Sequence, residues 1–358
     1  MSYFIRNANV FTIASEEALD IQKVLPVGNY TVKSNPITGQ YFLEMVDSFE
    51  PLKKLYGTTT KNTDRILRTF MDRPNSTGVM LSGEKGSGKS LLAKTISIEA
   101  AKMGVPTLII NTAYSGDSFN KFMQDIEQPC VILFDEFEKV YGDNDQEAAL
   151  TLMDGVFPSR KLFVLTCNDK WRINQHMRNR PGRIFYMIEF SGLDAAFIRE
   201  YCNDVLVNKQ HTDKVCEIAC LFEEFNFDML KALIEEMNRY DETPQQAISM
   251  LNAKPEYNNK GNFDVKLFIA GHEITTPELA TTTWHGNPLM ATIFVEYDTD
   301  PECKLETDED TYHQKIFVSN DLKKVAAEQG IFTFQNEAGD VMMLTRQKIK
   351  ESFNYMAL

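Results

Sequence analysis

The amino-acid sequence predicts an α/β protein whose centre is a parallel β-sheet. Helical patterns separate the first four of five short apolar runs, as in chains that cross back over a sheet between strands. Each run is continuous rather than alternating, which is typical of strands buried on both faces. The runs cover residues 78–81, 107–110, 130–134, 162–166 and 184–188, and helices are expected at 89–102 and 146–155.

Four parts of different character are expected along the 358 residues. They are an N-terminal β-rich segment at 1–50, an α/β core at 51–190, a small helical lid at 191–253 and a mostly β C-terminal domain at 254–358. The first contains a predicted hairpin at 29–33 and 40–44 around a Pro/Gly turn. The later helices are expected at 195–208, 213–224 and 227–240, and the later strands at 266–270, 291–297, 315–319 and 330–334.

The composition excludes several classes of protein. Hydrophobic residues are 43% and charged residues 25% of the chain, which excludes collagenous, coiled-coil and wholly disordered proteins. No run of about 18 apolar residues occurs, so no membrane span is expected. Charged residues in the first 20 positions disfavour a secretory signal, and we expect a cytoplasmic protein.

The net charge and the cysteine and histidine content limit which partners and metals are expected. The chain has 37 basic and 51 acidic residues, a net charge of -14, so nucleic acid is not expected as a partner unless a basic patch overrides this charge. Neither the six cysteines, which form no CxxC pair, nor the five scattered histidines predict a metal cage. Residues 296–310 contain eight acidic residues and only Lys304 as a base, which favours either a solvated loop or a docking surface for a basic partner.

A phosphate-binding loop is the strongest motif. Residues 83–90 read GEKGSGKS, which satisfies G-x-x-x-x-G-K-[ST] between an apolar strand and a helix. In such a loop the backbone N–H groups bind the α and β phosphates, the lysine reaches the β and γ phosphates, and the serine hydroxyl ligates Mg²⁺. A merely flexible glycine turn is the alternative. The expected nucleotide-binding residues are Gly83, Glu84, Lys85, Gly86, Ser87, Gly88, Lys89, Ser90 and Leu91, with Ser90 also a metal ligand.

Two carboxylates follow a later apolar strand. Residues 131–136 read VILFDE, so Asp135 is expected to hold the Mg²⁺ and its water shell, and Glu136 to polarise the attacking water. An acidic loop that continues into Glu138 is the alternative. Unpaired carboxylates after so apolar a strand are costly without a cationic neighbour, which favours the metal site.

Asn168 ends the next strand, where its amide could hydrogen-bond the γ-phosphate and the attacking water together. An isolated asparagine in this position is more often a turn residue. Its order after the phosphate loop and the carboxylate pair favours a catalytic role.

Three arginines lie close together at Arg178, Arg180 and Arg183, around Pro181 and Gly182. They are poorly placed to reach the phosphate loop of their own chain and well placed to project from a surface. An arginine supplied in trans to a γ-phosphate can raise turnover by roughly 10³ to 10⁵. A solvated basic turn is the alternative.

Together these motifs resemble the AAA family of ring-forming P-loop ATPases. GEKGSGKS is similar to its Walker A motif, VILFDE to its Walker B motif, Asn168 to its first sensor and residues 179–183 to its RPGR motif. The helix of residues 146–155 also looks like the family's helix before the sensor strand. The resemblance covers residues 51–252 and implies a P-loop parallel-sheet sandwich with a helical lid, ATP and Mg²⁺ as ligands, a hexameric ring, and Arg180 and Arg183 as arginine fingers.

The chain departs from the family between the second and third strands of the core. Only about twenty residues, 111–130, take the place of the segment that carries the aromatic pore loop. This short segment is similar to that of the mitochondrial translocase of the Rieske protein, which puts threading through a pore in doubt. Tyr114 is either a remaining pore-facing aromatic or a packing residue. Residues 225–228 contain no second sensor arginine.

The leading hypothesis is a Mg²⁺-dependent ATPase that assembles into a homo-oligomeric ring and remodels or assembles proteins. Residues 1–50 or 255–358 would select the protein client. One alternative is a nucleic-acid motor or helicase loader on the same core, against which stands the acidic charge. Another is an interaction module that ATP assembles and slow hydrolysis resets.

Overall fold

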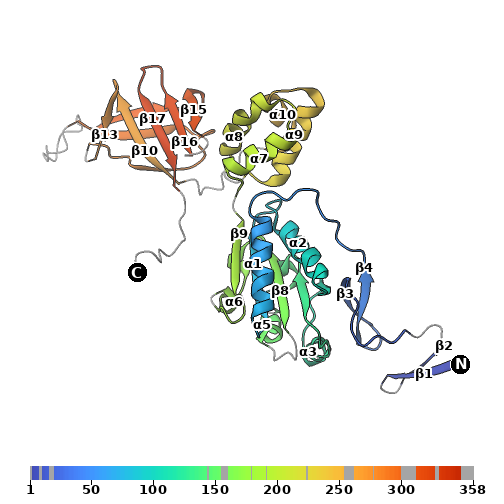
Figure 1. Ribbon diagram of the computed structural model, residues 1–358. Coiled ribbons are helices and arrows are strands. Elements are labelled where there is room, and N and C mark those ends of the chain that lie inside the picture. Colours follow the sequence, from blue (N-terminus) through green and yellow to red (C-terminus); the bar gives the residue numbers. More distant parts are fainter. Residues whose placement is uncertain are drawn as a thin grey trace. The chain divides into compact units, whose positions relative to one another are not determined.

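The computed structural model divides into two compact units, residues 1–84 with 88–190 and residues 85–87 with 191–358 (Figure 1). Each unit is described by itself below. The structure describes residues 2–7, 10–15, 20–142, 145–154, 160–178, 180–190, 192–222, 225–253, 262–276, 278–299, 312–326 and 330–347.

A seven-stranded sheet forms the centre of the first unit. Its strand order is β4-β3-β6-β7-β8-β5-β9, and every neighbouring pair is parallel except β3 with β4. The strands are β3 (Asn29–Ser34), β4 (Tyr41–Val46), β5 (Thr77–Gly83), β6 (Thr107–Ile110), β7 (Cys130–Phe134), β8 (Lys161–Cys167) and β9 (Tyr186–Phe190). The predicted α/β fold with a parallel sheet is confirmed. β9 begins two residues later than expected, although Phe185 N already donates to Gly78 O on β5 (2.8 Å).

Helices cover both faces of this sheet. They are α1 (Thr59–Asp72), α2 (Lys89–Lys102), α3 (Asp117–Gln124), α4 (Phe137–Val140), α5 (Gln146–Asp154) and α6 (Gln175–Arg178). One core joins the sheet to α1 and α2 through residues such as Phe70 and Ile96. The other joins it to α3 and α5 through residues such as Phe119 and Leu152. The layers therefore form the expected helix–sheet–helix sandwich.

The N-terminal segment contributes to the same sheet. The predicted hairpin is present as β3 and β4, and β3 pairs in parallel with β6. Segment 1–50 was expected as a separate part, but these strands extend the core sheet because Asn29–Thr31 align with Thr107–Ile109. A second hairpin, β1 (Ser2–Asn7) with β2 (Val10–Ser15), had no sequence-based expectation.

Helices open the second unit, at α7 (Ala195–Val205), α8 (Thr212–Cys220), α9 (Phe227–Tyr240) and α10 (Pro244–Met250). Local sequence explains where they begin. Asp194 accepts a hydrogen bond from Phe197 N (2.7 Å) and Asn226 accepts one from Met229 N (2.9 Å), so both cap a helix N-terminus. Thr243 forms a capping box with Gln246 in front of α10.

The C-terminal region is mostly β, as predicted. The strands are β10 (Asn262–Ile269), β11 (His272–Ile274), β12 (Thr283–His285), β13 (Ile293–Asp298), β14 (Tyr312–Phe317), β15 (Leu322–Ala326), β16 (Ile331–Gln335) and β17 (Val341–Arg346). All their pairings are antiparallel. Their inward side chains form one core that includes Phe263, Phe332 and Phe334. Most of the acidic segment, residues 300–310, lies outside the described residues.

A search for membrane spans among the described residues finds no helix with the length and apolar character that crossing a bilayer requires.

Candidate functional site

Three neighbouring strands of the first unit bring the predicted site residues together. β7, β8 and β5 are adjacent and parallel, so their carboxyl ends lie at one edge of the sheet. The phosphate loop follows β5, Asp135 follows β7 and Asn168 follows β8. A ligand in an open α/β sheet binds outside the carboxyl ends of the strands, which is where these side chains meet.

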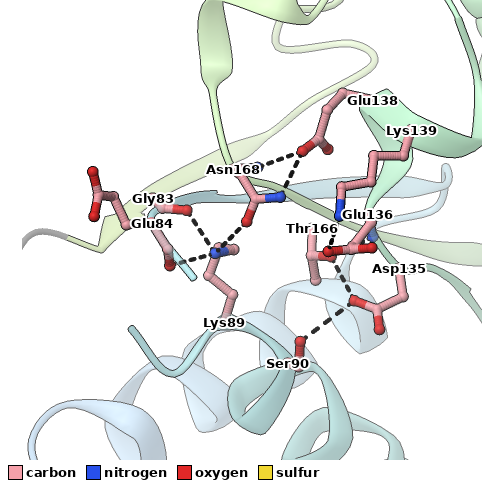
Figure 2. A network of polar contacts seen from close by, with 10 residues as sticks. All are labelled: Gly83, Glu84, Lys89, Ser90, Asp135, Glu136, Glu138, Lys139, Thr166 and Asn168. Carbon is pink, nitrogen blue, oxygen red and sulfur yellow. Dashed lines mark hydrogen bonds and ion pairs between the residues drawn. The ribbon is translucent and has the colours of Figure 1, made fainter. Parts of the chain in front are cut away.

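Lys89 lies at the centre of this cluster (Figure 2). Its Nζ donates to the carbonyl oxygens of Gly83 (2.5 Å) and Glu84 (2.7 Å) and to Asn168 Oδ1 (3.2 Å). The residue is only 6% exposed. Lys89 therefore holds the phosphate loop and the sensor strand together through one ammonium group.

Burial lowers the pKa of Lys89, and the neighbouring Cys167, Glu138, Asp135 and Glu136 act in the opposite direction. Desolvation disfavours the charged ammonium, whereas a nearby anion favours it. A polyphosphate beside Nζ would add negative charge and stabilise the ammonium further. The position is thus suited to binding an anionic ligand.

The phosphate loop opens α2 in the way that the motif requires. Gly88 is the N-cap of α2 and adopts φ 102°, a left-handed conformation that L side chains rarely take. Leu92 N donates to Gly88 O (3.0 Å), so the helix begins at once after this turn. Ser90 and Leu91 lie in the first turn of α2, where free N–H groups and the helix dipole favour an anion.

Three residues of the loop, Lys85, Gly86 and Ser87, belong to the second unit. Within that unit Phe227 N donates to Gly86 O (3.0 Å).

Ser90 and Asp135 form a pair of oxygen ligands suited to Mg²⁺. Ser90 Oγ donates to Asp135 Oδ1 (3.4 Å), and Asp135 Oδ1 also accepts from Thr166 Oγ1 (2.7 Å). A hydroxyl and a carboxylate side by side beside a phosphate site match the preference of Mg²⁺ for one or two protein oxygens plus phosphate and water. The residues present therefore fit the ion.

Glu136 has a constrained backbone and a half-exposed side chain. Its φ of 51° places a residue other than glycine in the left-handed region, and its N–H donates to Thr166 Oγ1 (2.8 Å). Its carboxylate forms an ion pair with Lys139 (2.5 Å) and keeps 45% of its side-chain surface exposed. Strained backbone of this kind clusters at functional sites. Glu136 can therefore meet a water molecule at the mouth of the site.

Glu138 and Thr166 are site residues that the motifs did not predict. Glu138 Oε1 accepts from both the backbone N (2.9 Å) and the side-chain Nδ2 (2.8 Å) of Asn168. This fixes the Asn168 amide with Oδ1 toward Lys89, as Figure 2 shows. Thr166 joins Asp135 to the backbone of Glu136. The sequence placed Glu138 only in the alternative of an acidic loop.

Replacing Glu138 by glutamine tests whether it orients the sensor amide. The Glu138→Gln side chain keeps an oxygen that can accept both hydrogen bonds, but it loses the charge that strengthens them. In the opposite amide orientation its NH₂ group meets the Asn168 NH₂ group and turns that amide around. We expect turnover to fall about tenfold or more, with little change in nucleotide affinity. Single-turnover and nucleotide-binding measurements would separate the two quantities. Equal losses in affinity and turnover, together with a lower melting temperature, would assign Glu138 a structural role instead.

Arg180 and Arg183 do not lie at the phosphate site of their own chain. Arg183 precedes β9, and a Cβ atom on Gly78 would lie 1.9 Å from Arg183 O, so this backbone packs directly on the start of β5. The phosphate loop begins at the other end of β5, about 17 Å away at 3.3 Å per residue. The guanidinium of Arg183 donates to His176 O (3.0 Å), and Arg180 is exposed. The third arginine, Arg178, stacks 4.6 Å from the centre of the Trp171 ring.

Tyr114 packs within the first unit. Its ring meets Tyr41 edge-on at 5.2 Å and Phe119 at 5.5 Å, and its backbone N donates to Tyr141 Oη (3.3 Å). Of the two roles considered for Tyr114, these contacts favour packing over a pore-facing aromatic.

Comparison with known proteins identifies the domain that carries this site. Residues 79–191 match the ATPase family associated with various cellular activities, AAA. The chain is 29% identical over 143 residues to the nuclear valosin-containing protein-like of Mus musculus, which covers 35% of this chain and 16% of that protein. It is 30% identical over 146 residues to the ATP-dependent zinc metalloprotease FtsH of Halothermothrix orenii. The aligned region covers 34% of this chain and 22% of that protein.

A third relative is a 26S proteasome regulatory subunit of Arabidopsis thaliana, 28% identical over 165 residues, which cover 40% of each chain. The chain thus spans well under half the length of the relatives that it matches. The family match, residues 79–191, spans the phosphate loop, the carboxylate pair and the sensor strand of this chain. Residues 79–191 of this protein therefore carry a P-loop ATPase domain of the AAA family.

Proposed function

We propose that the protein hydrolyses ATP with Mg²⁺ in a homo-oligomeric ring and uses the cycle to remodel or assemble a protein client. The observation that carries the proposal is the convergence of Lys89, Asn168 and the carboxylate pair at one sheet edge. The match to AAA ATPases supports the same chemistry.

The triphosphate of ATP would lie along the phosphate loop, with Lys89 moving from the Gly83 and Glu84 carbonyls to the β and γ phosphates. Ser90 and Asp135 would hold Mg²⁺, which neutralises charge on the phosphate oxygens. Exchange of carbonyl partners for phosphate partners gives a stronger, charge-assisted bond. Binding therefore releases the loop carbonyls and orders the ligand.

Glu136 would orient and polarise the attacking water. For this its carboxylate must leave Lys139, which holds it in the present conformation. Asn168, oriented by Glu138, would donate to the γ-phosphate through the second N–H of its Nδ2, and its Oδ1, once released by Lys89, would accept from the attacking water. The site as described is therefore a resting arrangement, and ATP would replace the present contacts of Lys89 and Glu136.

Arginine from a neighbouring subunit would complete the site. Arg180 and Arg183 lie near the start of β5, away from the phosphate loop of their own chain, so they would act on the γ-phosphate of an adjacent copy. An interface that uses different surfaces on its two sides closes into a ring when the rotation permits. We infer a hexamer by similarity to the family. We infer a protein client rather than nucleic acid, because a chain of net charge -14 repels a phosphate backbone.

Lys89→Ala tests the proposal directly. Loss of the ammonium that faces the phosphates should abolish detectable ATP turnover and weaken binding of a fluorescent ATP analogue by at least about tenfold. Lys102→Ala, at the far end of the same helix, is the matched control, because Lys102 is exposed and pairs only weakly with Glu99; it should leave both quantities unchanged. Retained turnover in the Lys89 variant would contradict the proposed site.

A further inference from the structure

The two-stranded ribbon of β13 and β14 has an apolar outer face. The strands pair in register from Ile293 with Phe317 to Asp298 with Tyr312. Their inward side chains Ile293, Val295 and Phe317 are fully buried in the core of the C-terminal region. The alternate residues therefore face outward, and these include the cross-strand pair of Phe294 and Ile316.

This outer face departs from the usual pattern of an antiparallel sheet. Such a sheet has apolar side chains on the buried face and polar ones on the solvated face. Here Phe294 is 48% exposed, Ile316 49% and Val318, two residues beyond Ile316, 39%. Met290, in the turn before β13, is 82% exposed. Single exposed apolar residues are ordinary, but a cross-strand pair with apolar neighbours is typical of a binding surface.

The two edges of the ribbon differ. Along β13, Ala280 N donates to Glu296 O (3.0 Å) and Asp298 N donates to Glu278 O (2.7 Å), so the chain itself covers this edge. In the part of the chain that the structure describes, β14 pairs with β13 alone. Every second residue of such an edge strand directs its N–H and C=O groups outward, which is a template for another strand.

The charge around the ribbon indicates what would bind there. Glu296 continues the outer face of β13, is exposed and accepts from Gln314 Nε2 (3.3 Å) on β14. The sequence that joins the two strands adds six acidic residues between 300 and 310 and only Lys304 as a base. A partner would therefore need apolar side chains for the outer face and positive charge for its acidic end.

We propose that the ribbon docks an extended protein segment, apolar at every second residue and basic at one end, which adds to β14 as a further strand. Main-chain hydrogen bonds to β14 would supply affinity, and contacts with Phe294 and Ile316 would supply specificity. Lysine or arginine side chains would lie at the acidic end. This surface deepens the proposed function, on which it rests, because it gives the class of client segment that the protein recognises.

The test uses the full-length chain and two labelled peptides. One has valine at every second position, threonine between the valines and lysines at one end, and the other has glutamate in place of each lysine. Binding is measured by fluorescence anisotropy with ADP present, so it requires no turnover. The double variant Phe294→Thr with Ile316→Thr removes the apolar pair and keeps residues that favour strands. Phe42→Thr is the matched control, because Phe42 is 45% exposed on the edge strand β4 of the first unit.

We expect the lysine peptide to bind the wild-type and Phe42→Thr chains, the double variant to bind at least about tenfold more weakly, and added salt to weaken binding. The glutamate peptide should not bind. Equal binding by the double variant, or equal binding of both peptides, would overturn the proposal. A third result would also overturn it: the wild-type chain binds no peptide, and the double variant differs from it in assembly mass. The outer face would then join copies of this chain. A wild-type chain that binds the lysine peptide but hydrolyses no ATP would contradict the proposed function and leave the docking surface intact.

Discussion

Glu136→Gln should bind ATP as the wild-type protein does and hydrolyse it about 10² to 10⁴ times more slowly. The amide keeps the size of the side chain but cannot accept a proton from the attacking water. The phosphate contacts of Lys89 and the oxygens of Ser90 and Asp135 are untouched, so nucleotide affinity should hold. Single-turnover hydrolysis and equilibrium binding, measured on the same preparation, check both parts.

Lys139→Ala separates the role of Glu136 from the ion pair that holds it. The pair is about half exposed on both sides, so its loss should cost little stability. If Glu136 acts only after leaving Lys139, the lysine variant should keep its turnover or gain some. Near-normal hydrolysis by Glu136→Gln would remove Glu136 from the role of base.

Arg183→Ala should lose about 10³-fold or more of its turnover, and mixing it with Lys89→Ala should restore part of the activity. Each variant lacks what the other supplies. An Arg183→Ala subunit keeps an intact phosphate loop, and a Lys89→Ala subunit keeps its arginines. Activity against mixing ratio, at constant total protein, measures the restoration.

Arg172→Ala is the control for this experiment, because Arg172 is an exposed arginine in the same region of the chain. Its turnover should stay close to that of the wild-type protein. Mixed assemblies that stay as inactive as either variant alone would contradict a site shared between subunits. Full activity of Arg183→Ala by itself would remove Arg183 from the site.

The core strands could be predicted from the sequence because burial on both faces leaves continuous apolar runs. β7 was expected at 130–134 and lies at Cys130–Phe134. β14 was expected at 315–319 and lies at Tyr312–Phe317. The shift has a physical cause: the inward residue Lys315 pairs with Asp340 (2.7 Å) inside the C-terminal region, whereas Ile316 and Val318 face outward. Lys315 and Ile316 therefore depart from the usual polar and apolar pattern, whereas the buried Phe317 follows it.

Some residues of the candidate site could also be predicted from the sequence, and others could not. Motif spacing placed Asp135, Asn168 and the phosphate loop that carries Lys89 directly after strands, and parallel strands bring such ends together. Glu138 was not predicted because its role depends on a hydrogen bond to a residue 30 positions away on another strand. A glutamate two residues after the carboxylate pair gives no local signal of that contact. A hydrogen-bond partner on another strand can be identified only once the fold is known.

The trans arrangement of arginine and nucleotide is tested most directly by the mass of Glu136→Gln in solution. Light scattering with ATP and with ADP, at matched protein concentration, compares the two states without turnover. The account predicts a closed assembly of about six subunits with ATP and a smaller species with ADP, because the γ-phosphate is what the neighbouring arginines would bind. A monomer in both states would contradict the shared site.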